Sequence, residues 1–121
     1  MKKHPLSIDY VQDIIDAMDR AEEFIGNSGH DEFARDLKSV YAVVRCLEII
    51  GEAVKKIQWE HRKRYKSIPW RSLAGMRDKL IHDYAGVSVD IVWQTTKEDI
   101  PNIKPLLLKM LQELRLEEIE D

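Results

Sequence analysis

The sequence has little of what cross-links a small protein or bends its chain sharply. Its 121 residues include one cysteine, Cys46, so no internal disulfide can form and a reducing compartment is expected. Five glycines and four prolines leave few places for tight turns, which favours long helices. No apolar run approaches the roughly 20 residues that cross a bilayer, and no secretory leader is recognised. We therefore expect a cytoplasmic protein that does not enter the membrane.

Charge is abundant but unevenly distributed along the chain. Charged residues make up 34% and hydrophobic residues 44%, a balance typical of a folded globular domain. The formal net charge is −3, yet residues 54–79 hold nine Lys or Arg against Glu60 and Asp78. That segment carries a net +7, which leaves −10 for the rest of the chain. This segregation permits a local positive field on an acidic protein.

Helical periodicity dominates the chain, and no long stretch alternates with the period of a strand. We predict a single domain over residues 1–121, an all-α, up-and-down bundle of about five helices. The first three expected helices run from an N-cap at Ser7 to Gly26–Asn27, from about Asp31 to about Glu60, and from about Trp70 to His82. A fourth begins after an N-cap at Ser88. Pro101 and Pro105 then break the chain before a last helix over the C-terminal residues.

Two details of the second helix matter later. Gly51 lies in its middle and costs about 1 kcal/mol in helix propensity relative to alanine, so we predict that it lets another helix approach closely. Residues 61–66 are expected to form a basic connector to the next helix.

The sequence offers no metal site. The histidines, His4, His30, His61 and His82, are scattered, no two of them lie four residues apart, and one cysteine cannot complete a zinc pattern. We predict no metal and no cofactor. Cys46 has no identifiable histidine base, and a lone cysteine in an apolar helix is usually a small core residue, so it receives no role.

Glu48 and Glu52 lie four residues apart, on the same side of the second helix. A carboxylate pair can perform acid–base chemistry if it is buried. Ion pairing of Arg45 with Glu48 and of Lys56 with Glu52 explains the same spacing and is favoured here.

A permanent cation, an imidazole and a phenol lie within eight residues at Arg77, His82 and Tyr84. On a continuous helix Arg77 and His82 would be about 140° apart, so they would not share a face. They converge if the helix loosens near its end or if two copies of the chain meet. The alternative is that Arg77 pairs with a neighbouring aspartate while His82 and Tyr84 close the helix.

These residues resemble a known family. The pattern IPWR, AGMRDKLIHDY, IVW and DIP within residues 68–101 is similar to that of the HepT-like toxins of the HEPN superfamily. Their R-x4-H-x-Y motif is matched by Arg77, His82 and Tyr84. The segment RCLEIIGEA, residues 45–53, resembles the central helix of the family, and the resemblance extends over essentially the whole chain.

The resemblance implies a helical bundle that forms a homodimer, with two copies of the motif lining a cleft at the interface. It implies metal-independent endoribonuclease activity in a toxin–antitoxin system. It also implies a partner, an MNT-type nucleotidyltransferase antitoxin that neutralises the toxin by transferring AMP from ATP to the motif tyrosine, here Tyr84.

The residue types suit this chemistry. RNA cleavage without a metal uses the ribose 2′-OH as nucleophile, so protons must move and a phosphorane must be stabilised. His82, with an ordinary pKa of about 6.5, can act as general acid or base. Arg77 can hold two phosphate oxygens through a bidentate contact. Tyr84 can position substrate, and AMP attached to it would block the cleft and repel RNA.

The basic run offers phosphate contacts that do not depend on sequence. Its candidate RNA-binding residues are Arg62, Lys63, Arg64 and Lys66. A solvated connector explains the same charges.

Two other functions remain open on the sequence alone. One is a catalytically inactive helical dimer that binds a nucleotide or serves as the partner of a nucleotidyltransferase. The other is a structural bundle whose long helix builds an oligomer. The intact motif favours the enzyme.

Overall fold

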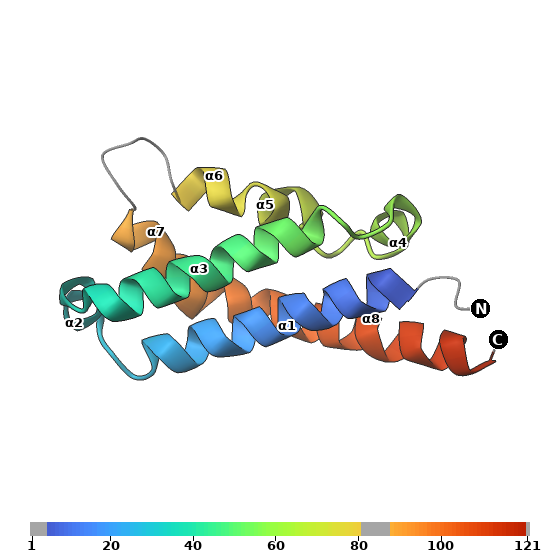
Figure 1. Ribbon diagram of the computed structural model, residues 1–121, viewed down its shortest axis with the longest axis horizontal. Coiled ribbons are helices and arrows are strands. Elements are labelled where there is room, and N and C mark those ends of the chain that lie inside the picture. The colour runs from blue at the N-terminus through green and yellow to red at the C-terminus, as the bar shows by residue number, and fades with distance from the viewer. Residues whose placement is uncertain (1–4, 81–87, 121) are drawn as a thin grey trace.

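A computed structural model describes residues 5–80 and 88–120, and within these ranges every regular element is helical (Figure 1). The prediction of an all-α bundle is confirmed. The elements are α1 (Pro5–Ile25), α2 (His30–Arg35), α3 (Leu37–Val54), α4 (Trp59–Arg64), α5 (Trp70–Ala74), α6 (Met76–Leu80), α7 (Val89–Gln94), the π-helical turn η1 (Thr95–Asp99) and α8 (Ile100–Glu120).

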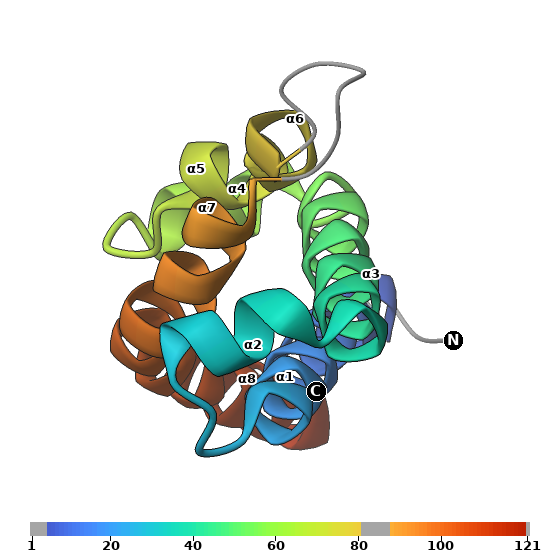
Figure 2. The same ribbon diagram turned by 90° about the vertical axis from the view of Figure 1, so that its left-hand side faces the viewer.

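Three long helices form the body of the bundle. α1 packs against both α3 and α8 and runs antiparallel to them (Figure 1). The short helices α5 and α6 pack on α3, and α2 crosses one end of the bundle (Figure 2). None of the described helices is both long enough and apolar enough to cross a membrane.

The core is built from the apolar stripes that the sequence shows. The inward residues of the three long helices are almost fully buried: Val11, Ile14, Met18 and Ala21 on α1, Val40, Leu47, Ile50 and Val54 on α3, and Leu107, Met110 and Leu114 on α8. Burying one such aliphatic side chain contributes about 1.5–3 kcal/mol, so these stripes supply most of the stabilisation.

The start of the first helix differs from the prediction. Ser7 was expected to be its N-cap, but α1 already includes Pro5, and Ser7 lies inside it and is fully buried. Proline is tolerated in the first turn, where its missing N–H has no helical partner to lose.

The expected long helix over about 31–60 is three helices, and Asp36 makes the first interruption. Its backbone leaves the helical region at φ −99° and ψ 82°, and its carboxylate accepts bonds from the Ser39 backbone N–H at 3.3 Å and the Ser39 hydroxyl at 2.6 Å. These bonds to Ser39 lower the Asp36 pKa. Asp36 therefore caps α3 instead of continuing α2.

The second interruption follows Val54. Arg62 reaches back and donates hydrogen bonds to the backbone carbonyls of Val54, at 2.7 Å, and Ile57, at 3.1 Å. The Val54 carbonyl also accepts from the Ile57 N–H at 3.1 Å, so Arg62 adds a second donor there and holds the chain where α3 ends. The residues expected to form only a connector are largely helical, since α4 extends to Arg64.

The third predicted helix is divided at Gly75 into α5 and α6. Its expected end at His82 lies outside the described residues. The predicted N-cap at Ser88 is confirmed, because its hydroxyl accepts a bond from the Ile91 N–H at 3.4 Å.

The prolines do not interrupt the last helix. Helical structure continues from Val89 to Glu120, and the predicted break at Pro101 and Pro105 is wrong. The wider π-helical turn η1 comes directly before α8, and α7 and α8 point in different directions (Figure 1). A π-helical turn shifts the hydrogen-bond register and bends the helix. The chain can therefore stay helical through Pro101, although proline has no N–H to donate.

Gly51 allows the close approach that the sequence suggested. A Cβ at this position would lie 3.4 Å from the Leu73 carbonyl oxygen, 3.6 Å from that of Ala74 and 3.9 Å from the Arg77 backbone nitrogen. The α5–α6 backbone therefore rests directly on α3. The prediction of a close helix contact at this glycine is confirmed.

We predict that Gly51→Ala is tolerated and gains up to about 1 kcal/mol from helix propensity, because its Cβ would meet its neighbours at 3.4–3.9 Å, which are ordinary van der Waals distances. Gly51→Val places further carbons against the carbonyls of Leu73 and Ala74, and overpacking of this kind costs about 1–3 kcal/mol. Thermal unfolding followed by circular dichroism measures both. A valine variant as stable as wild type would contradict the close contact.

Candidate active site around Arg77

Arg77 lies on the outward side of α6. Met76 and Leu80 are spaced i and i+4 and are buried, so they fix this short helix on the core. The side chain of Arg77 then points away from the core and is 59% exposed. The sequence sets this arrangement locally, because helix geometry places Arg77 about 60° from Leu80 and about 100° from Met76, at the edge of the buried face and next to α3.

Glu48 on α3 is the anionic partner of Arg77. Its side chain is 19% exposed, and its Oε2 lies 3.8 Å from Arg77 Nε. The other carboxylate oxygen lies 3.6 Å from Arg45 Nη1, and Arg45 also contacts Glu52 at 3.2 Å. The ion pairing of Arg45 with Glu48 is confirmed, and Glu52 pairs with Arg45 instead of the predicted Lys56.

The contact with Glu48 orients the guanidinium of Arg77 but leaves its N–H groups available to a ligand. At 3.8 Å the pair is an ion pair but exceeds hydrogen-bond distance. Within residues 5–80 and 88–120, Arg77 has no other ion-pair partner. A guanidinium carries five N–H donors, so this one can still bind two oxygens of a phosphate.

His82 and Tyr84, the other two motif residues, lie in the segment 81–87 outside the described residues. The residues on either side of that segment lie close together, since the Ser88 N–H donates to the Leu80 carbonyl at 3.4 Å. The structure therefore places Arg77 and the two ends of the motif segment at the same part of the bundle.

α7, which follows this segment, is attached to α2 by His30. His30 Nε2 lies 2.6 Å from Asp90 Oδ1, and Nδ1 lies 3.1 Å from Asp31 Oδ1. The His30 ring also meets the edge of Trp93 at 5.8 Å between centroids. Hydrogen bonds to Asp31 and Asp90 raise the His30 pKa. These contacts help to fix the C-terminal side of the motif segment.

The candidate RNA-binding residues of the basic run divide into two pairs. Arg62 is engaged by backbone carbonyls, and Arg64 pairs with Glu117 on α8. Lys63 and Lys66 are exposed, and neither has an ion-pair partner among the described residues.

The remaining candidate groups do not join this site. Cys46 is buried, and burial raises the pKa of its thiol, which disfavours the reactive thiolate. Over residues 5–80 and 88–120, no three His, Cys, Asp or Glu side chains cluster as metal ligands would.

Glu48 is the residue whose importance the sequence understated. Its spacing from Arg45 and Glu52 suggested only pairing within one helix. Its contact with Arg77 joins residues 29 positions apart and follows from packing of α6 on α3. The nearby Gly51, one turn further along the same face, was the available signal.

The fold and the site define a class: an all-α bundle that presents an outward arginine next to the segment with a histidine and a tyrosine. Residues 14–110 match the family described as Ribonuclease HepT-like. The chain belongs to this HepT-like ribonuclease family, so the predicted family and the prediction of an enzyme of this class are confirmed.

Individual relatives agree with the family. "Putative RNase MJ1216" from Methanocaldococcus jannaschii is 48% identical over 105 residues, which are 87% of each chain. "Probable ribonuclease HepT" from Thermococcus cleftensis is 49% identical over 96 residues, 79% of this chain and 87% of the relative. No solved structure matches the chain significantly.

The His30 contacts predict a pH-dependent stability. Because the folded-state pKa of His30 is raised above 6.5, its contribution is fully present below pH 6.5 and is lost as pH rises through the folded-state value. The difference in melting temperature between wild type and His30→Gln should therefore be larger at pH 5.5 than at pH 8.5. Asp90→Asn should reproduce the effect, whereas a difference that grows with pH would contradict it.

Proposed function

We propose that this protein is a metal-independent endoribonuclease in which Arg77 and His82 act on a phosphodiester of RNA. The observation that carries the proposal is Arg77: it is exposed, oriented by Glu48, and retains N–H donors for a phosphate. It lies within the part of the chain that matches a ribonuclease family. Relatives named as ribonucleases at 48–49% identity support the same activity.

In the proposed reaction the ribose 2′-OH attacks the adjacent phosphorus, and the bond to the 5′-oxygen breaks. His82 takes the proton from the 2′-OH or delivers one to the leaving 5′-oxygen, work that suits an imidazole near neutral pH. Arg77 opposes the negative charge that grows on the non-bridging oxygens. Glu48 is a positioning residue, because it touches Arg77 and not the reacting atoms.

We further propose that the protein is the toxin of a toxin–antitoxin pair. Its partner would be an MNT-type nucleotidyltransferase that transfers AMP from ATP to the Tyr84 hydroxyl and releases pyrophosphate. The added phosphate and adenosine would occupy the space beside Arg77 and repel RNA. The position of Tyr84 within the motif, two residues after His82, supports this control.

We also propose a homodimer that brings two copies of the motif together. The outward face of α3 carries a stripe of exposed residues, two large hydrophobic and two charged: Leu37, Tyr41, Arg45 and Glu52. Their spacing places them within about 80° of one another around the helix. Leu37 and Tyr41 are 61% and 64% exposed, which is unusual for large hydrophobic residues side by side. The stripe continues to the Glu48–Arg77 pair, so a partner seated on it would also reach the motif.

The first test is cleavage of RNA by purified protein in the presence of EDTA. His82→Ala should lower the rate by about 10²- to 10⁴-fold, the usual range for loss of a general acid or base. Glu48→Gln should lower it by only about two- to fivefold, since it weakens a partly exposed ion pair that acts through Arg77.

Intact-mass measurement serves as a control in that assay, because AMP on Tyr84 would hide activity. Circular dichroism checks that each variant is folded. EDTA-resistant cleavage that disappears in His82→Ala supports the ribonuclease. No cleavage of bulk RNA or transfer RNA by unmodified protein would overturn it and favour a nucleotide-binding or partner-binding module.

The dimer is tested by light scattering after size-exclusion chromatography. Leu37→Asp with Tyr41→Asp should give a monomer, because two charges replace apolar area on the proposed contact face. Leu116→Asp on α8 is the matched control, since Leu116 is 58% exposed but lies on another helix, and it should remain dimeric. A wild-type monomer, or equal effects of both substitutions, would contradict this interface.

A further inference from the structure

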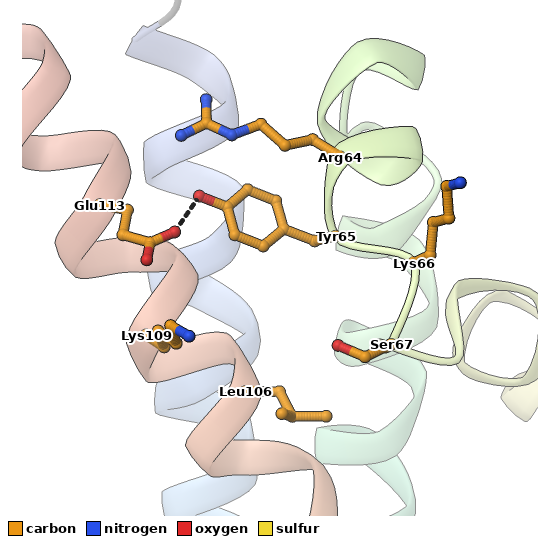
Figure 3. A pocket seen from close by; sticks show the side chains of 7 residues that line it. All are labelled: Arg64, Tyr65, Lys66, Ser67, Leu106, Lys109 and Glu113. Carbon is orange, nitrogen blue, oxygen red and sulfur yellow. Dashed lines mark hydrogen bonds between the residues drawn. The ribbon is translucent and has the colours of Figure 1, made fainter.

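A pocket of about 460 Å³ lies away from Arg77, between α8 and the linker that joins α4 to α5 (Figure 3). α8 contributes Leu106, Lys109 and Glu113, whose spacing places them on one face of the helix. The opposite wall consists of Arg64, Tyr65, Lys66 and Ser67. Its size falls in the range of small-ligand sites.

Tyr65 forms a fixed aromatic wall of this pocket. Its hydroxyl donates a 2.6 Å hydrogen bond to Glu113, and burial together with this bond raises the Tyr65 pKa to about 12. The guanidinium of Arg64 lies 5.2 Å from the ring centre and pairs with Glu117. The ring is therefore held by its hydroxyl, whose bond to Glu113 Figure 3 shows, and by the nearby guanidinium of Arg64.

The charges around the pocket favour an anion at one end. Glu117 is engaged by Arg64 and Glu113 by the Tyr65 hydroxyl. Lys66 and Lys109 are exposed and have no ion-pair partner among the described residues. The Ser67 hydroxyl points toward α8, the helix that carries Lys109, whereas Lys66 points away from it (Figure 3). A phosphate would therefore lie beside Lys109 and Ser67, away from the carboxylate of Glu113.

The remaining surface suits a nucleobase. Leu106 and the ring of Tyr65 both line the pocket and supply apolar surface that a base can contact. A cation for the backbone next to an aromatic surface for a base is the usual composition of single-strand binding sites. No part of this pocket belongs to the Arg77 site.

We infer that this pocket binds one nucleotide unit of an RNA strand, with its phosphate at Lys109 and Ser67 and its base against Leu106 and Tyr65. The inference rests on the proposed ribonuclease function and extends it, because substrate would be held at a second place on the bundle. Lys66 would contact the neighbouring phosphate on the outer side. A free mononucleotide presents the same chemistry and is the other possible source of the ligand.

The test measures binding separately from cleavage, in full-length protein carrying His82→Ala. The anisotropy of a labelled short single-stranded RNA should report a Kd about tenfold weaker after Lys109→Glu, since a phosphate contact becomes a repulsion. Arg20→Glu is the matched control: Arg20 is exposed and without an ion-pair partner among the described residues, but lies on α1, outside both the pocket and the proposed dimer face. It should change the Kd by less than about twofold. Ser67→Ala is a second, milder variant and should weaken binding about threefold.

Nuclear magnetic resonance distinguishes the two ligand sources. Shifts of the Ser67 and Leu106 amides on adding RNA, but not on adding AMP, support a strand-binding subsite, and shifts with both support a nucleotide pocket. Equal weakening by Lys109→Glu and Arg20→Glu, or no shift with either ligand, would overturn the inference. If the pocket inference fails in this way while the wild-type protein still cleaves RNA, the proposed ribonuclease function is unaffected. Binding of AMP by a protein that never cleaves RNA overturns the ribonuclease and retains the pocket.

Discussion

The site depends on how closely the chain from Leu73 to Arg77 approaches α3. Burial of Leu73 and Leu80 presses α5 and α6 onto the bundle, but the hydrophobic effect has no direction and sets no fixed distance. At Gly51 the backbone of this stretch lies so close that a Cβ would already contact two carbonyl oxygens and a backbone nitrogen at 3.4–3.9 Å, so a side chain larger than a methyl would push α5 and α6 away. Glu48 lies one turn earlier on the same face, so the surface that admits α6 also carries the carboxylate that meets Arg77.

The charges at this contact nearly cancel. Arg45 and Arg77 face Glu48 and Glu52, two cations and two anions, so this part of the molecule has little net field. In the proposed function, attraction of a polyanion would then come from elsewhere, and the exposed lysines of the α4–α5 region and of α8 are the candidates for it. Arg77 is itself one of the nine cations in residues 54–79, but the exposed Lys63 and Lys66 of that segment lie at the end of α4 and just after it, on a different element from Arg77. Binding strength and chemistry can be altered independently in such an arrangement.

The sequence predicted the features that depend on local periodicity or on one residue. The apolar stripe of α1, the cap at Ser88 and the close contact at Gly51 are of this kind. The break at Asp36 was not predictable in the same way, because an aspartate on a helix surface and an aspartate that caps a new helix look alike in sequence. At the end of α3, Arg62 donates to carbonyls five and eight residues earlier in the chain. The sequence does not show whether an arginine makes such bonds or extends into solvent.

Long-range features of the site were still less visible. The pairing of Arg77 with Glu48 and the bond between Tyr65 and Glu113 join residues that come together only when helices pack. The prolines were misread for a related reason: a π-helical turn before Pro101 lets the helix bend and continue, and no composition rule marks such a turn. Sequence therefore identified the chemical groups, and packing decided which of them meet.

The hydrogen bond from Ser88 to Leu80 has a consequence for how such a protein can evolve. Leu80 and Ser88, which flank the motif segment, are neighbours in the bundle, so the two ends of the segment are held together by contacts outside it. Changes of sequence between these two residues can therefore be sampled while the helices remain folded. The bundle is a scaffold on which activity can be gained, changed or lost without loss of the fold.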